Sequence, residues 1–246
     1  CAAGFPNELV SPLDADMRDQ LAGLPLGNEW NQHASVIYPH GGWIDPAALT
    51  RALLASAEAS GLLTSHYGQT INAITQQETG WQLHSEQGTV PCNGPLVLAN
   101  GAGLSDLLPE NLGLPVYPVR GQVSHLPTTP SLSALQTVLC YEGYLTPVSA
   151  QGEHCLGATY GRNDVSLAWR ADEQQENLAR LQRCLPAQDW VNGLSAGDQG
   201  RVSLRAATRD HLPLLGKLAT GVWVMGALGA RGLCSAPLLG EWLAAA

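Results

Sequence analysis

Two helices stand out in the pattern of apolar and polar positions along this chain. Apolar side chains recur at helical spacing over residues 47–60, directly after Asp45 and Pro46, and Gly61 ends the pattern. An aspartate followed by proline is a typical N-cap and first helical position. Residues 171–185 repeat the helical spacing, with acidic side chains toward the start and arginines toward the end, which suits the helix dipole. The sequence therefore predicts a helix in each segment.

Period-two alternation predicts short strands in much of the remaining chain. Residues 65–90 contain two such stretches around a polar, glycine-ending turn, and residues 201–206 form another. Between residues 116 and 159, three extended stretches are joined by segments rich in proline, serine and glycine, which predicts an antiparallel sheet. The fold class is therefore mixed, α/β with α+β character.

The last 25 residues join an apolar run to a helical pattern through three glycines. Gly226, Gly229 and Gly232 lie three residues apart, where backbone could approach a ligand without an intervening Cβ atom. The helix that follows would direct its unpaired N–H groups and positive dipole end toward the same place. A ligand-binding junction and a plain tight turn both fit this pattern.

A second junction of this kind follows the apolar run 95–99. Asn100, Gly101 and Gly103 come directly after it. As a dinucleotide-binding motif the signal is weak, because Asp106 occupies the place of the third glycine.

Composition excludes several classes of protein. With 246 residues and 45% hydrophobic content the chain can bury one large core or two interleaved ones. It has no apolar stretch of roughly 20 residues and no secretory leader pattern, so we expect a cytoplasmic protein without a membrane span. The six cysteines lie far apart with no C-x-x-C pair, which favours reduced, buried thiols and no structural metal.

The formal charge of −9 argues against general attraction to nucleic acid. A polyanionic partner would need a local basic patch. Arginines that could form one are Arg162, Arg170, Arg180 and Arg183.

Six ordered segments together resemble the D-amino-acid-oxidase-like family of FAD-dependent amine oxidoreductases. The segments are YPHGGWIDPAALT, PVRGQVSHLPTTP, VLCYEGYLTP, HCLGATYGR, RAATRDHLPLLG and GALGARGLCSAPLLGE. Within this family they are similar to the C-terminal oxidoreductase half of bifunctional bacterial enzymes that modify the wobble uridine of tRNA. Such enzymes carry a fused SAM-dependent methyltransferase module, and the resemblance covers almost all of the chain from about residue 30 onward.

The resemblance implies a fold in which parts of a Rossmann-like FAD domain are interleaved with an antiparallel-sheet substrate domain. It assigns residues 40–111 and 203–246 to the FAD domain, and residues 1–39 and 112–202 to the substrate domain. The family's N-terminal G-x-G-x-x-G unit has no counterpart before residue 101, so the chain reads as a fragment whose FAD binding is in question.

The resemblance also implies a reaction. The substrate would be tRNA with a 5-carboxymethylaminomethyl uridine, whose CH2 group loses a hydride to FAD. Water would hydrolyse the resulting imine to glyoxylate and the aminomethyl nucleoside, and dioxygen would take the electrons. By family position, Arg205 grips the substrate carboxylate and Tyr144 adds a hydrogen bond. Arg205 could instead pair with Asp198 or Asp210, and His125 and His211 are interpreted as structural or surface histidines.

FAD itself would be held at the two strand-to-glycine junctions and at one further position. The helix dipole would stabilise negative charge on the flavin ring, although Arg231 could equally be a solvent-facing turn residue. The predicted FAD-binding residues are Ile71, Ala99, Asn100, Gly101, Gly229, Arg231, Gly232 and Leu233. Arg120 could face either the substrate cavity or the nearby sheet, and it is left unassigned.

Three functional hypotheses follow from these observations. The first is the tRNA-modifying oxidase. The second is an oxidase of a free small amine such as glycine or sarcosine, which the acidic net charge favours. The third is a fragment that folds but binds no cofactor.

Overall fold

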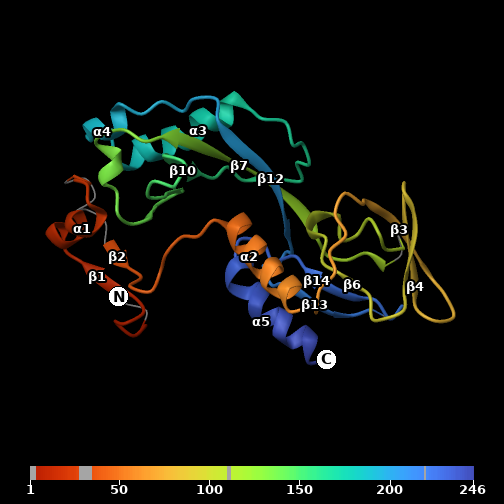
Figure 1. Cartoon of the computed structure of the whole chain (residues 1–246). Helices are drawn as coiled ribbons and strands as arrows, with labels where there is room; N and C mark the ends of the chain where they lie inside the picture. Colours follow the sequence, from red (N-terminus) through yellow and green to blue (C-terminus); the bar gives the residue numbers. More distant parts are fainter. Residues whose placement is uncertain (1–3, 28–34, 110–111, 219) are drawn as a thin grey trace. The chain divides into compact units, whose positions relative to one another are not determined.

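The computed structural model describes residues 4–27, 35–109, 112–218 and 220–246, and it divides the chain into two compact units. Cys1, one of the six cysteines, lies outside the described residues, and the other five are free thiols. The first unit comprises Cys1–Ile44, Gly121–Tyr160 and Ser166–Ser203. The second comprises Asp45–Arg120, Gly161–Val165 and Leu204–Ala246. Figure 1 labels the elements of both.

Most of the first unit is an antiparallel sheet with helices. Its helices are α1 (Ala15–Ala22), α3 (Ala171–Cys184) and α4 (Asp189–Asn192). Its strands are β1 (Ser11–Leu13), β2 (Ser35–Ile37), β8 (Leu139–Cys140), β9 (Tyr144–Leu145), β10 (Glu153–Gly157) and most of β7 (Tyr117–Pro127). β7, β10, β9 and β8 are neighbours in that order, and each of these pairs is antiparallel. The predicted antiparallel sheet is thereby confirmed.

Helix α1 is an element that the sequence analysis did not predict. Asp14 caps it, because its carboxylate accepts from the amide of Met17 at 2.8 Å, and Gly23 ends it with φ 75°. Both signals are standard for helix ends. The hydrophobic pattern does not predict this helix, because few apolar side chains lie between Asp14 and Gly23 and they form no apolar stripe.

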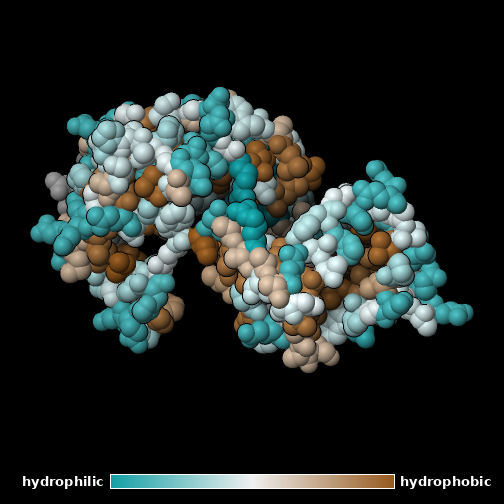
Figure 2. Space-filling view, in the orientation of Figure 1, coloured by the Kyte–Doolittle hydropathy of each residue, from teal (hydrophilic) through white to brown (hydrophobic). Residues whose placement is uncertain are grey.

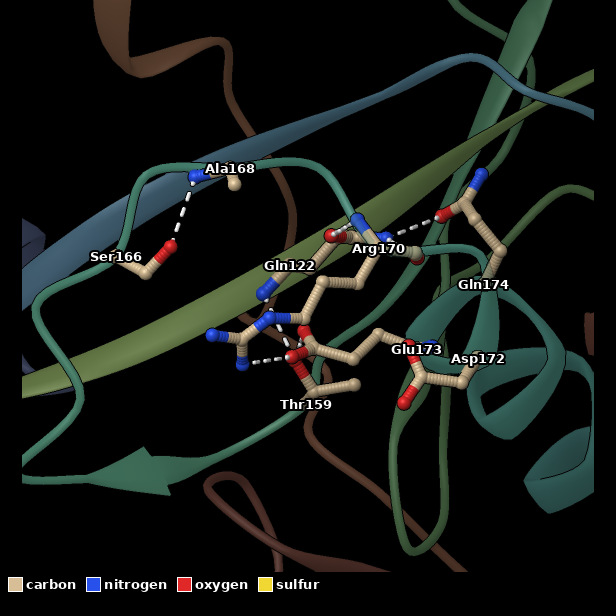
Figure 3. A network of polar contacts seen from close by, with 8 residues as sticks. All are labelled: Gln122, Thr159, Ser166, Ala168, Arg170, Asp172, Glu173 and Gln174. Atoms are coloured by element: carbon tan, nitrogen blue, oxygen red, sulfur yellow. Dashed lines mark hydrogen bonds and ion pairs between the residues drawn. The ribbon is translucent and has the colours of Figure 1, made fainter.

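A buried polar network fixes α3 against β7 (Figure 3). The side-chain amide of Gln122 donates to the carbonyl of Arg170 at 2.7 Å and accepts from the amide of the same residue at 3.0 Å. Gln174 accepts from the Ser124 hydroxyl at 2.6 Å and donates to two backbone carbonyls. Buried hydrogen-bond networks of this kind favour one arrangement of the two elements that they join.

The second unit holds two small sheets and two helices. Its elements are α2 (Pro46–Ala59), β3 (Ile71–Gln76), β4 (Trp81–Ser85), β5 (Gly88–Cys92), β6 (Val97–Leu98), β11 (Gly161–Arg162), β13 (Leu214–Lys217), β14 (Trp223–Gly226) and α5 (Gly232–Ala244), with the end of β12 (Gly200–Ala207). β3, β4 and β5 form an antiparallel meander, whereas β6 pairs with β14 in parallel. Only two residues of the predicted strand 95–99 are extended and paired.

Helix α2 begins where the sequence predicts. Asp45 accepts from the amides of Ala47 and Ala48 at 2.8 and 3.1 Å. None of its residues is buried, and Leu53 is 63% exposed. Figure 2 shows tan and brown side chains on the surface over α2 and α5, so both helices present apolar side chains to solvent.

Candidate functional site

Two strand ends meet at one edge of the small sheet in the second unit. β6 and β14 run in parallel, with Val97 opposite Trp223 and Leu98 opposite Val224. Their carboxyl ends therefore lie side by side, and the chain leaves β6 into Asn100 and β14 into the glycine loop. Ligands of open α/β sheets bind outside such carboxyl ends. Both sequence-predicted glycine junctions are thus brought to the same edge.

A cavity of about 690 Å³ lies on the β6 side of this edge. It is lined by Ile71, Ala99 and Asn100, three of the predicted FAD-binding residues, which come from separate parts of the chain. Its volume is in the range of pockets that hold drug-sized ligands or parts of cofactors. A hydrogen bond within the turn after β6 stabilises it, because the Asn100 side-chain amide donates to the carbonyl of Gly103 at 2.7 Å. Gly101 in the same turn adopts φ 65°.

Four further predicted residues surround the start of α5. No side chain caps this helix, whose N-cap residue is Arg231. The first amides of a helix have no intrahelical partner, so those of Gly232 and Leu233 are available to an anion or to an electron-rich ring edge. Arg231 is exposed and forms no ion pair with any residue in the described part of the chain. An uncapped helix N-terminus beside a cationic side chain suits the negative charge of a reduced flavin.

The three glycines of this junction differ in what they do. Gly229 has φ 56°, a conformation that favours glycine, and a Cβ atom there would meet nothing within 4 Å. Gly226 instead allows close packing, because a Cβ atom would lie 3.0 Å from the side chain of Leu104. Of the three, only Gly229 combines a left-handed backbone with open space, as a ligand-facing glycine requires.

Arg205 lies on β12 in the second unit and lacks the partners of an ordinary structural arginine. Its Nη1 atom is buried and has no hydrogen-bond partner among the described residues. Asp210, one of the two predicted alternatives, is in the same unit, and its carboxylate accepts from the amide of Leu212. An unpaired buried N–H group is costly, so this guanidinium is suited to an external carboxylate.

A backbone hydrogen bond links Arg205's strand to the glycine loop. The Gly229 amide donates to the carbonyl of Ala206, the residue after Arg205, at 2.9 Å. The turn that follows is also fixed, because the Thr208 hydroxyl donates to the carbonyl of Leu212 at 2.7 Å. The predicted substrate cation and the predicted cofactor loop are therefore neighbours in one unit.

Tyr144 belongs to the first unit. It lies on β9 opposite Gly157 of β10, whose missing side chain leaves space for the phenol, since a Cβ atom there would be 3.3 Å from the hydroxyl. Its hydroxyl is 4.0 Å from the Cys155 sulfur. Nothing in these contacts tests its predicted role toward a carboxylate, which stays a prediction.

Two histidines of the sheet have contrasting surroundings. His125, interpreted from sequence as structural or surface, is half exposed with its Nδ1 atom 3.5 Å from the Glu153 carboxylate. His154 is fully buried. Its Nδ1 atom is hydrogen-bonded to the carbonyl oxygen of Thr146, and its Nε2 atom to the hydroxyl of Thr128, each at 2.9 Å. Burial lowers the pKa of His154, so this ring is neutral and structural.

Sequence reasoning missed several residues that line the same cavity as Asn100. Thr70 and Asn72 flank Ile71, and Asp106 contributes from the turn after β6. Asp106, which the sequence analysis describes only as a departure from the dinucleotide motif, lies close to Gly103, where a Cβ atom would be 3.1 Å from its carboxylate. Polar residues on both sides of Ile71 were a usable signal for a ligand-facing strand end.

Comparison with known proteins shows the family of this chain. The family described as FAD dependent oxidoreductase matches residues 1–246, and the chain belongs to this family. The resemblance deduced from the six motifs is confirmed. None of the helices in the described part of the chain has the length and apolar character needed to cross a bilayer.

Curated relatives are similar in sequence over almost the whole chain. The chain is 47% identical to the tRNA 5-methylaminomethyl-2-thiouridine biosynthesis bifunctional protein MnmC of Aeromonas hydrophila and 41% identical to that of Aliivibrio fischeri. Each alignment covers 98% of this chain and 39% of the relative, so the chain spans about two fifths of their length.

Solved structures share the fold. Glycine oxidase from Geobacillus kaustophilus is similar with a TM-score of 0.78 at 22% identity, covering 99% of this chain and 63% of that one. L-proline dehydrogenase from P. horikoshii also has a TM-score of 0.78, at 16% identity, covering 96% and 63%. At these identities the likeness concerns the fold alone, and it confirms the predicted fold class.

Proposed function

We propose that this chain is the oxidoreductase part of a cytoplasmic tRNA-modifying enzyme and acts on 5-carboxymethylaminomethyl uridine at the wobble position. Bound FAD would supply a two-electron hydride acceptor for the substrate CH2 group, with dioxygen as the final acceptor. The substrate C–H bond breaks as the nitrogen lone pair forms a C=N bond. Water then cleaves this imine to glyoxylate and the 5-aminomethyl nucleoside. The relatives' printed function and the family's cofactor support this assignment.

The observation that carries the proposal is the unpartnered, buried Nη1 atom of Arg205 beside the Gly229 loop. The substrate's carboxymethyl group ends in a carboxylate, and a guanidinium binds a carboxylate with two parallel hydrogen bonds that fix its orientation. Fixing the carboxylate positions the adjacent CH2 group for hydride loss. Tyr144 is the predicted second hydrogen-bond donor.

The described residues fit the cofactor at two places. Ile71, Ala99 and Asn100 line the 690 Å³ cavity, which suits the nucleoside side of FAD. The open amides at the start of α5 suit the flavin ring. No residue is needed as a general base if the substrate amine arrives neutral.

The test compares Arg205→Ala with Arg209→Ala, which removes an exposed arginine four residues further along the chain. The Arg205 variant loses kcat/KM for the modified tRNA by roughly 10- to 150-fold, the worth of hydrogen bonds to a charged group. Its FAD affinity and melting temperature stay at the wild-type values, because the lost Nη1 group has no internal partner. Near-normal turnover by Arg205→Ala would disprove the assignment.

The second candidate, an oxidase of free glycine or sarcosine, is favoured by the net charge of −9. Turnover of glycine and of modified tRNA distinguishes these two candidate functions. We expect glycine to be a poor substrate, since RNA contacts remote from the CH2 group contribute to reactivity. Comparable kcat/KM values for glycine and modified tRNA would favour the amine oxidase. Failure of the wild-type chain to bind FAD in a titration would favour the inactive fragment.

A further inference from the structure

The first unit contains a second cavity, of about 1110 Å³, that none of the predicted catalytic or FAD-binding residues lines. Its walls come from α1, β2, the turn after β2, the segment around β8 and the C-terminal end of α3. Apolar side chains form most of the lining, with a few polar groups among them. This composition is typical of pockets that bind small organic groups.

Tyr141 presents an unused hydrogen bond at this cavity. Its hydroxyl is buried and has no hydrogen-bond partner among the described residues. Burial raises the pKa of this phenol, so the hydroxyl keeps its proton and is a donor. The neighbouring carboxylate of Glu142, which also lines the cavity, is an acceptor. The cavity wall thus offers a donor and an acceptor, the two kinds of group that a base edge with a carbonyl and an N–H group requires.

Two aromatic side chains of the turn after β2 line the same cavity without being packed into the core. Trp43 is 45% exposed and Tyr38 is more exposed still. Gly41 permits the turn between them, because its amide donates to the carbonyl of Tyr38 at 2.8 Å and a Cβ atom would lie only 3.0 Å from that oxygen. The Trp43 indole N–H has no partner in the described part of the chain. Exposed aromatic faces of this kind stack on bases.

Arg183 adds a cation at the edge of the cavity. Its side chain is 55% exposed, and its one ion pair within the described residues is a long contact of 3.5 Å to Glu176. Glu176 is already paired with Arg180 at 2.8 Å. The Arg183 guanidinium is therefore available for a phosphate group.

We propose that this cavity binds an unpaired nucleotide of the RNA substrate, with its base stacked on Trp43 or Tyr38, its edge at Tyr141 and Glu142, and its phosphate near Arg183. The inference rests on the proposed function, which makes RNA the substrate. It also accounts for RNA binding by a chain with a net charge of −9, which gains little from phosphate attraction over its whole surface. Recognition of single-stranded RNA depends instead on stacking and base-edge contacts.

Two variants test the cavity, each with a matched control. Trp43→Ala is compared with Trp169→Ala, whose tryptophan in the same unit is similarly exposed at 41% but does not line the cavity. Tyr141→Phe, which removes the hydroxyl alone, is compared with Tyr67→Phe, a change at the surface of the second unit. The probe is a dye-labelled, unmodified RNA anticodon stem-loop with uridine at the wobble position, and its Kd is measured by fluorescence polarisation.

We expect Trp43→Ala to raise the Kd about fivefold or more, the worth of one base stack. Tyr141→Phe raises the Kd about threefold or more, the contribution of one hydrogen bond, with no loss of melting temperature, because the hydroxyl has no partner among the described residues. A purely structural tyrosine would lower the melting temperature instead. Both controls bind like the wild type.

Unchanged affinity in both cavity variants would overturn the inference and place RNA docking elsewhere, and so would failure of the wild type to bind the stem-loop. These outcomes leave the proposed function separately testable. The probe is unmodified and cannot be oxidised, whereas the proposed function is decided by turnover of modified tRNA in Arg205→Ala. That variant binds the unmodified stem-loop like the wild type.

Discussion

The amide of Gly229 donates a hydrogen bond to the carbonyl of Ala206 at 2.9 Å, and Ala206 directly follows Arg205. This single contact joins the loop before α5 to the strand that carries the predicted substrate cation. A shift of the loop therefore displaces Arg205's strand as well. Cofactor binding at the loop and carboxylate binding at Arg205 are expected to depend on each other for this reason.

Substitution of Gly229 tests this link. Gly229→Ala places a side chain at φ 56°, which costs roughly 1–2 kcal/mol and favours a changed loop conformation. Because no atom lies within 4 Å of the new Cβ, backbone strain is the sole cost. We expect weaker FAD binding, by about tenfold for a loss of 1.4 kcal/mol, in a titration followed by flavin absorbance.

Gly240→Ala is the matched control for that change. Gly240 lies inside α5, where alanine gains up to about 1 kcal/mol over glycine and meets nothing within 4 Å. This variant keeps its FAD affinity and becomes slightly more stable. Equal FAD affinity in the two variants would contradict a role for the Gly229 loop.

The buried network between α3 and β7 gives a prediction about stability. Gln174→Leu removes two donors to the carbonyls of Ala196 and Gln199, and one acceptor shared by Gln122 and Ser124. Leaving these buried groups unpaired costs roughly 2–4 kcal/mol of unfolding free energy. Urea denaturation measures the loss.

Gln175→Leu makes the same substitution one residue along α3, at an exposed position. Its unfolding free energy stays within about 0.5 kcal/mol of the wild type. A similar loss in both variants would mean that leucine itself, and not the network, is responsible.

His154 predicts how stability depends on pH. Its pKa is lowered by burial from the ordinary value of 6.5, so the folded protein keeps the ring neutral while the unfolded chain takes up a proton below that pH. The unfolded state then binds more protons, and the free energy of unfolding falls as pH decreases. Urea midpoints measured between about pH 7.5 and about pH 5.5 therefore decrease.

Two variants test whether His154 causes this pH dependence of the free energy of unfolding. His154→Gln has a lower midpoint at neutral pH and a flatter slope, because the titrating ring is gone. Gln175→Leu, at an exposed position without a titrating group, keeps the wild-type slope. If the slope survives unchanged in His154→Gln, other groups cause the acid destabilisation.

Elements with local signals at their ends were predictable from the sequence. Helix α2 begins after Asp45, and α3 ends at Cys184, one residue before the predicted end. Weak or absent periodicity explains why the length of β6 and the presence of α1 were not predicted. β6 consists of two residues because it pairs only with β14, and α1 lacks an apolar stripe although Asp14 and Gly23 mark its ends.

The site was predictable only in part. Ile71, Ala99 and Asn100 were identified through the family motifs, and the structure gathers them around one cavity. That the Arg205 Nη1 atom lacks a hydrogen-bond partner among the described residues could not be predicted, because Asp198 and Asp210 are both plausible neighbours in sequence. The cavity at Tyr141 is formed by four separate segments of chain, and no local sequence pattern predicts such an arrangement.

The order in which the chain visits its two units has a consequence for engineering. Six segments alternate between the units, so the backbone crosses from one to the other five times, and β7 and β12 each contain residues of both. No single cut of the gene yields either unit as a continuous polypeptide. Exchange of substrate preference with a relative therefore requires scattered substitutions within both units rather than a swap of one contiguous block.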